Sequence, residues 1–172
     1  MAEGRILIVE DEHIVAMGIK RMLKSLGYTV TGVASSGKDA ISKAESTFPD
    51  LILMDIMLKG ELDGVEAAKE IKERFDVPIV YLTAYSDSNI LERVKKTGPS
   101  GYIVKPFDEK DLYSNIEIAL HRSRKEKKDI EEGIEGEIEG EIEEGEIKEV
   151  EEKNKVNYLF PCGVLLSFNN FY

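Results

Sequence analysis

Five short apolar segments, each followed by a segment with helical spacing, constrain the fold of this chain more than any other feature. The apolar segments are residues 5–10, 28–34, 50–55, 78–83 and 101–104. Most of them are apolar almost throughout, which is typical of strands buried on both faces of a parallel sheet. Five β-then-α units in a row predict an α/β fold with helices on both faces of that sheet.

The intervening segments repeat apolar residues every three or four positions, which predicts amphipathic helices. The first is expected to end at Gly27, as a C′ residue. The second is expected to begin at Ser36, with Asp39 three residues later in a pattern that resembles a capping box. The third is expected to begin near Asp63, which we interpret as an N-cap residue and not as a metal ligand. The fifth is expected to begin at Asp108.

Charge separates the chain into two parts. Residues 1–124 carry 17 basic and 20 acidic side chains, and residues 125–172 carry 6 and 14, for a total of -11. This balance argues against direct binding of nucleic acid. The first residues lack the pattern of a signal peptide, and no stretch of the first 155 residues approaches the length of a membrane span. Cys162 is the single cysteine, so no internal disulfide can form. We therefore expect a cytoplasmic protein without a membrane partner.

Chemically active side chains stand where four of the predicted strands end. Glu10 and Asp11 come at the end of the first strand, Asp55 ends the third, Thr83 ends the fourth, and Lys105 follows the fifth. In parallel α/β sheets the reactive site lies outside the carboxyl ends of the strands. We therefore expect these five side chains to lie close together.

Crowded carboxylates disfavour one another's ionisation, and a hard divalent cation such as Mg²⁺ relieves this. Beside such a cation Asp55 could act as a nucleophile and form an aspartyl phosphate. The Lys105 ammonium and the Thr83 hydroxyl could contact the phosphoryl oxygens. A turn or cap role would be the better interpretation of Asp55 taken alone, but the convergence of four strand ends favours the reactive one.

Several motifs in residues 4–124 resemble the receiver domain of two-component response regulators. They are ILIVEDE (6–12), LILMDIML (51–58), DGVEAAKEIK (63–72), PIVYLTAYSD (78–87) and GYIVKPF (101–107). The resemblance implies a flavodoxin-like (βα)5 doubly wound parallel sheet with the strand order 2-1-3-4-5.

The resemblance also implies a role for each residue at the strand ends. Asp55 is implied as the phosphoacceptor. Asp11, Asp55 and the backbone carbonyl of Met57 are implied as Mg²⁺ ligands, with Glu10 reaching the metal through water. Thr83 and Lys105 are implied to contact the phosphoryl group.

Two further positions match the family. Tyr102 corresponds to the aromatic switch residue that works with Thr83, and the Lys105–Pro106 peptide bond is implied to be cis. There are two departures from the family pattern. Glu10 replaces the commoner Asp, and the loop of residues 58–62 is one residue longer and lacks its Pro. Neither departure removes a reacting group.

The function implied by the resemblance is phosphorelay signal transduction. A sensor histidine kinase or a phosphotransfer protein would supply the phosphoryl group. The surface around the fourth helix, fifth strand and fifth helix would then control an output protein. The chain would catalyse only its own phosphorylation and dephosphorylation, and would otherwise not be an enzyme. The sequence leaves a homodimer open.

Other classes of protein were weighed against this one. A haloacid-dehalogenase-type phosphatase needs a second Asp two residues after the first, where Met57 stands. A dinucleotide-binding domain needs a Gly-rich turn after the first strand, where residues 10–12 are acidic. A pseudo-receiver that acts only as an interaction module would typically lack Asp55, Lys105 or the acidic pair. That module, and a truncated fragment of a larger hybrid sensor or regulator, remain the alternatives.

Three regions are predicted along the chain: a receiver domain over 1–124, an acidic low-complexity linker or helix extension over 125–155, and an apolar tail of unknown role over 156–172. Isoleucines recur every four residues from 130 to 142, as in a helix. The glycines between them each cost about 1 kcal/mol in a helix, and the alternation also fits a strand. We favour a flexible or partly helical linker.

Overall fold

The computed structural model describes residues 3–84, 88–144, 150–152, 155–159 and 165–168, with side chains over 3–84 and 92–130. The chain divides into two compact units, residues 1–126 and residues 127–172. The first unit contains all the residues predicted to carry chemistry.

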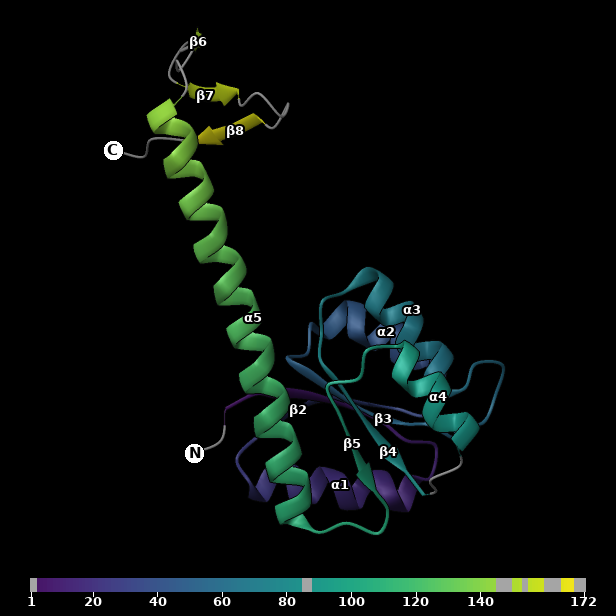
Figure 1. Cartoon of the computed structure of the whole chain (residues 1–172). Helices are drawn as coiled ribbons and strands as arrows, with labels where there is room; N and C mark the ends of the chain where they lie inside the picture. The colour runs from purple at the N-terminus through teal and green to yellow at the C-terminus, as the bar shows by residue number, and fades with distance from the viewer. Residues whose placement is uncertain (1–2, 85–87, 145–149, 153–154, 160–164, 169–172) are drawn as a thin grey trace. The chain divides into compact units, whose positions relative to one another are not determined.

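A five-stranded parallel sheet forms the centre of the first unit (Figure 1). Its strands are β1 (Arg5–Val9), β2 (Thr29–Ala34), β3 (Leu51–Asp55), β4 (Ile79–Thr83) and β5 (Gly101–Val104). They are hydrogen-bonded in the order β2-β1-β3-β4-β5. This confirms the predicted fold and strand order, and each strand begins and ends within one residue of its predicted range.

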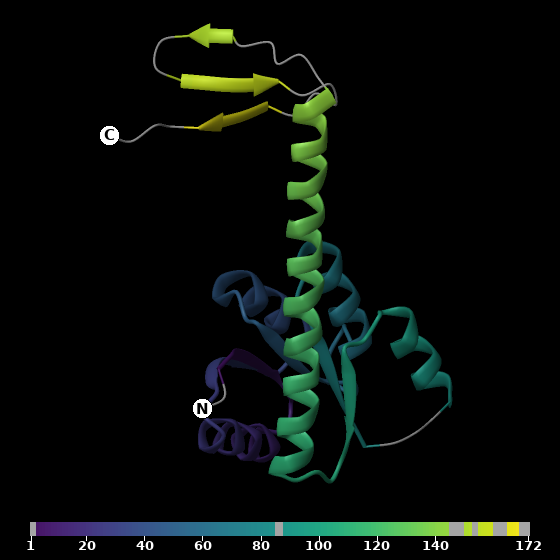
Figure 2. The ribbon, with the colours of Figure 1, turned by 60° about the vertical axis from the view of Figure 1, so that its left-hand side comes forward.

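Helices cover both faces of the sheet (Figure 2). The helices are α1 (His13–Ser25), α2 (Gly37–Thr47), α3 (Gly64–Arg74), α4 (Ser88–Lys96) and α5 (Glu109–Glu144). Helix α1 and the first turns of α5 pack on one face, where Ile19, Leu23, Leu112 and Ile116 are buried. Helices α2, α3 and α4 pack on the other face. The two apolar cores together hold the sheet in place between the helices.

The burial of the strands follows their place in the sheet. Every residue of β3 and β4 is buried. Strand β2 lies at the edge, and only Ala34 of that strand is buried. This burial explains why the sequences of the central strands are almost entirely apolar, while residues 29–34 of the edge strand contain Thr and Gly.

Local signals set the helix ends as predicted at three places. Gly27 has φ +95°, a left-handed conformation that favours glycine after a helix. The Ser36 hydroxyl accepts a hydrogen bond from the Asp39 N–H at 3.3 Å. The Asp63 carboxylate accepts from the N–H groups of Val65 and Glu66, and the Glu66 side chain accepts from the Asp63 N–H at 3.0 Å. Asp63 is therefore the N-cap of α3, within a complete capping box.

The second unit begins inside α5, which remains helical as far as Glu144. Three antiparallel strands follow: β6 (Val150–Glu152), β7 (Lys155–Leu159) and β8 (Leu165–Phe168). The region predicted as a linker is thus helical up to residue 144, and the region predicted as an apolar tail contains most of β7 and all of β8. Within the described ranges, we find no helix whose length and apolar character would suffice to cross a membrane.

Candidate functional site

The ends of four strands bring the predicted residues to one edge of the sheet. Residues Val9 and Met54 are in register between β1 and β3, and Asp55 is in register with Leu82 of β4. Thr83 is in register with Val104 of β5. Residues 10, 11, 55, 83 and 105 therefore lie at the same edge because their strands end at the same level.

Three carboxylates converge at this edge. One carboxylate oxygen from each of Glu10, Asp11 and Asp55 lies within 4.8 Å of the others. Glu10 is 2% exposed and Asp55 is 6% exposed. Burial raises the pKa of Glu10 above its usual value of 4.5, against the opposing effect of Lys105. Among the residues that the structure describes, this is the site with the donors that a hard divalent cation prefers.

Lys105 ties two of these carboxylates together. Its ammonium nitrogen lies 2.6 Å from Glu10 Oε2 and 2.7 Å from Asp55 Oδ2. Burial on its own would lower the pKa of Lys105, but the hydrogen bonds and charges of Asp55 and Glu10 raise it above the usual value. Lys105 is therefore protonated at neutral pH and offers a positive charge beside Asp55.

Asp55 is held on both of its oxygens. Oδ1 accepts a hydrogen bond from the Met57 N–H at 3.0 Å, and Oδ2 accepts from Lys105. The first residue of α3, Gly64, packs directly against the Asp55 backbone. A Cβ atom at Gly64 would lie 1.8 Å from the Asp55 carbonyl oxygen, and the Gly64 N–H donates to the Ile56 carbonyl at 3.0 Å. The position of Asp55 thus depends on a glycine at the start of α3.

Asp11 differs from the other two carboxylates in its partners. Its Oδ2 atom is buried and, within the described part of the chain, receives no hydrogen bond of good geometry. The Lys59 ammonium lies 3.0 Å from that oxygen as an ion pair. The interaction with Asp11 raises the pKa of Lys59. A buried oxygen without a hydrogen bond fits a ligand for a cation.

The remaining predicted residues lie around this cluster. The Thr83 side chain is buried. The backbone carbonyl of Thr83 accepts a hydrogen bond from the backbone N–H of Lys105 at 2.7 Å. Tyr102 projects outward from β5 and is 56% exposed. The Lys105–Pro106 peptide bond is cis. Met57, whose carbonyl is the implied fourth ligand, has an exposed side chain.

Sequence reasoning missed three residues that shape the site. Lys59 was noted only as part of an unusually long loop, and Gly64 only as part of a family motif. Arg93 of α4 was not noted, yet its guanidinium lies 2.6 Å from Asp63 Oδ2 and joins α4 to the start of α3. The extra length of the loop was the one available signal, and it pointed to the segment that carries Lys59.

Comparison with known proteins gives one consistent family. Residues 6–117 match the family model described as the response regulator receiver domain. The transcriptional regulatory protein PdtaR of Mycobacterium tuberculosis is 42% identical over 120 residues, which cover 70% of this chain and 58% of PdtaR. The transcriptional regulatory protein YdfI of Bacillus subtilis is 35% identical over 118 residues, which cover 68% of this chain and 55% of YdfI. The chain thus spans little more than half the length of these relatives.

Solved structures agree with the family match. The signal receiver domain of a modulated diguanylate cyclase from Desulfovibrio desulfuricans G20 has a TM-score of 0.70 and 38% identity, and the match covers 73% of this chain and 99% of that domain. A CheY-like receiver domain protein from Methanospirillum hungatei JF-1 has a TM-score of 0.66 and 29% identity, with coverage of 73% and 99%. The fold, the convergent strand ends and these similarities lead to one conclusion. This chain belongs to the response regulator receiver family of two-component signalling systems.

Proposed function

We propose that this receiver domain accepts a phosphoryl group on Asp55, with Mg²⁺ beside it, in phosphorelay signal transduction. One observation carries the proposal. The Asp55 carboxylate lies among two other carboxylates and is paired with the Lys105 ammonium at 2.7 Å, at the carboxyl edge of the sheet. A nucleophile, a cation site and a positive charge for the phosphoryl oxygens are thus combined in one place.

The donor atoms at the site fit Mg²⁺. Glu10, Asp11, Asp55 and the backbone carbonyl of Met57 would hold the ion, because hard oxygen donors suit it. The buried Oδ2 of Asp11, which lacks a hydrogen bond of good geometry, is in place to act as a ligand. When bound, the cation would screen the negative charges of Asp55 and of the incoming phosphoryl group.

Asp55 is the nucleophile in the proposed reaction. One carboxylate oxygen forms a bond to phosphorus while the bond from phosphorus to the donor's imidazole nitrogen breaks, and that nitrogen keeps the electron pair. The Met57 N–H holds the carboxylate in orientation. The Lys105 ammonium and the Thr83 hydroxyl stabilise the phosphoryl oxygens. Attack by water on the aspartyl phosphate later returns inorganic phosphate and the Asp55 carboxylate.

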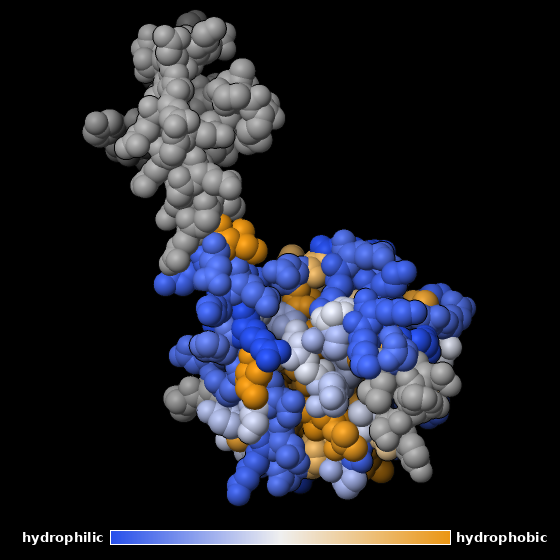
Figure 3. All heavy atoms as spheres, in the orientation of Figure 1, coloured by the Kyte–Doolittle hydropathy of each residue, from blue (hydrophilic) through white to orange (hydrophobic). Residues whose placement is uncertain are grey.

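The signal then passes to a surface of the domain. Thr83 would move toward the phosphoryl group, and its backbone is hydrogen-bonded to Lys105 directly after β5. Tyr102 and Val104 are each 56% exposed on β5, and Figure 3 shows apolar side chains at the surface between α4 and α5. An output protein, or a second copy of this chain, would recognise the face of α4, β5 and α5. A sensor histidine kinase or a phosphotransfer protein would supply the phosphoryl group, in a cytoplasmic setting.

Transfer from acetyl phosphate tests the proposal. With Mg²⁺, the intact mass of the wild-type chain should rise by one phosphoryl group, and removal of divalent cations with EDTA should prevent the rise. Asp55→Asn should abolish the labelling. Asp50→Asn is the matched control. Asp50 stands directly before the first residue of β3, and Asp55 is the last residue of the same strand. Equal labelling of the Asp55→Asn variant would exclude Asp55 as the acceptor, and an unlabelled wild type would favour a pseudo-receiver.

A further inference from the structure

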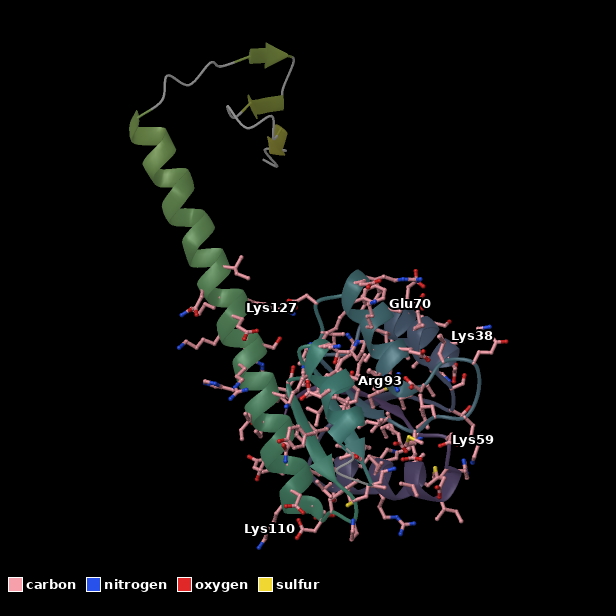
Figure 4. All side chains as sticks on the ribbon, turned by 45° about the vertical axis from the view of Figure 1, so that its right-hand side comes forward. Lys38, Lys59, Glu70, Arg93, Lys110 and Lys127 are labelled. Carbon is pink, nitrogen blue, oxygen red and sulfur yellow. The ribbon has the colours of Figure 1, made fainter. Side chains whose placement is uncertain are left out.

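The loop between Asp55 and α3 is tied to the rest of the domain by two lysines. Lys38 of α2 pairs with Glu61 of the loop at 2.5 Å, and both side chains are more than two-thirds exposed. Lys59, within the loop itself, pairs with Asp11 at 3.0 Å. Figure 4 labels Lys38 and Lys59 on the same side of the domain. The two ion pairs look alike, but only one of them involves the carboxylate cluster.

The Lys59–Asp11 pair is unequal in its burial. The Lys59 side chain is 83% exposed, whereas the Asp11 side chain is 9% exposed. Lys59 therefore reaches in from solvent to a carboxylate that has little access to water. An exposed lysine of this kind can leave its partner at small cost, because its ammonium regains full hydration.

Two lysines already pair with the three carboxylates of the site. Lys105 pairs with Glu10 and Asp55, and Lys59 pairs with Asp11. A divalent cation bound to Asp11 would meet the Lys59 ammonium at the same oxygen. Two positive groups cannot share that position without strong repulsion, so the lysine must leave when the cation binds.

We propose that the Lys59 ammonium competes with divalent cations for the Asp11 carboxylate. This competition lowers the affinity of the site for divalent cations. This inference rests on the proposed Mg²⁺ site and adds a residue that tunes it. Lys59 acts through its ion pair with Asp11, so it is a positioning residue. Lys59 belongs to the loop of residues 58–62 after Asp55, and its ion pair with Asp11 places it at the proposed cation site.

Cation binding to the full chain tests the inference without any phosphodonor. Free Mn²⁺ is counted by electron paramagnetic resonance during a titration, and Mg²⁺ is then used to displace it. Lys59→Met removes the competing charge while keeping a side chain of similar length. It should tighten binding by about two- to fivefold, the size expected for loss of one exposed ion pair. Lys59→Arg keeps the charge and should bind cations like the wild type.

Lys38→Met is the matched control. It removes one positive charge from the same side of the domain, but its partner Glu61 lies outside the cluster. Because Lys38 pairs with none of the three carboxylates, and exposed charges are screened by salt, Lys38→Met should change the affinity less than Lys59→Met.

Three results would overturn the inference. Unchanged or weaker cation binding in Lys59→Met would show that Lys59 does not compete. An equal tightening in Lys38→Met would show that the effect is one of general charge. In both cases the wild type still binds cations, so the proposed phosphoacceptor site stands. A wild type that binds no divalent cation would overturn this inference together with the proposed metal site.

Discussion

At the scale of single residues, Lys105 and Gly64 determine the environment of Asp55. Lys105 supplies a partly buried positive charge to two carboxylates that would otherwise repel each other. Gly64 has no side chain, which allows the start of α3 to pack against the Asp55 backbone. One residue sets the charge at the proposed phosphoacceptor and the other sets its position.

The close approach at Gly64 leads to a prediction about stability. Gly64→Ala would place a Cβ atom 1.8 Å from the Asp55 carbonyl oxygen, so the strand end or the helix must shift. We expect a loss of about 2 kcal/mol or more in the free energy of unfolding, measured in urea. Gly18→Ala is the control, because no atom lies within 4 Å of a Cβ atom there. Gly18 lies inside α1, so its replacement should stabilise by about 0.5–1 kcal/mol.

A Gly64→Ala variant as stable as wild type would show that the contact relaxes easily. That result would contradict the view that α3 fixes the backbone of Asp55. Acceptance of the phosphoryl group by the same variant gives a second measurement, and it should fall together with the stability.

At the scale of elements, the start of α3 joins the site to α4. Asp63 caps α3 with Oδ1, while its Oδ2 pairs with Arg93 of α4 at 2.6 Å. The phenol of Tyr81 in β4 is hydrogen-bonded to the Thr97 hydroxyl, just after α4, at 2.8 Å. The Arg93–Asp63 ion pair thus attaches α4 to the start of α3. The Thr97–Tyr81 hydrogen bond attaches the end of the α4 segment to β4.

The two roles of Asp63 can be separated by mutation. Asp63→Ala removes the cap and the ion pair, and should cost about 1–2 kcal/mol of unfolding free energy. Asp63→Asn keeps an oxygen that can cap the helix and loses only the charge. It should cost less, because exposed ion pairs contribute about 0–1 kcal/mol. Equal losses in urea unfolding of the two variants would mean that the pair with Arg93, and not the cap, carries the effect.

At the scale of the whole molecule, the receiver unit contains its own core. Among the side chains of α5 that the structure describes, which extend to residue 130, Leu120 is the last buried one. The Arg124 side chain donates to the Glu3 carbonyl at 3.1 Å. Residues 1–126 form one compact unit. This unit also holds all the groups proposed for phosphoryl transfer.

A shortened chain tests this independence. A chain ended after Glu126 should keep the circular dichroism spectrum of a folded α/β domain and accept a phosphoryl group at the rate of the full chain. A lower rate or a loss of cooperative unfolding would show that residues 127–172 contribute to the receiver unit. A chain ended after Asn115 is the comparison that should fail to fold, because it lacks the core residues Ile116, Ala119 and Leu120.

The sequence was enough to predict the sheet, its order and the edge where the candidate residues gather. Buried strands can be recognised in the sequence as short apolar runs. The position of a residue such as Asp55 then follows from its place at the end of a strand. The contacts of Lys59 and Arg93 were not predictable, because they depend on the path of a loop and on the packing of two helices. The close approach of Gly64 to Asp55 depends on tertiary contact in the same way.

The C-terminal region shows a different limit. Between residues 133 and 152 the isoleucine spacing fits a helix and the alternation with Glu fits a strand. The structure is helical to Glu144 and has a strand at Val150–Glu152. Neither local pattern predicts where the helix ends and the strand begins, since glycine weakens both kinds of element.

The location of the phosphoryl group tests the central claim most directly. The full chain is treated with acetyl phosphate and Mg²⁺, reduced with borohydride, which converts an aspartyl phosphate to homoserine, and digested for peptide mass spectrometry. We predict homoserine at position 55 and unmodified aspartate at positions 11 and 50. Modification at another aspartate, with position 55 unchanged, would contradict the assignment of Asp55 as the phosphoacceptor.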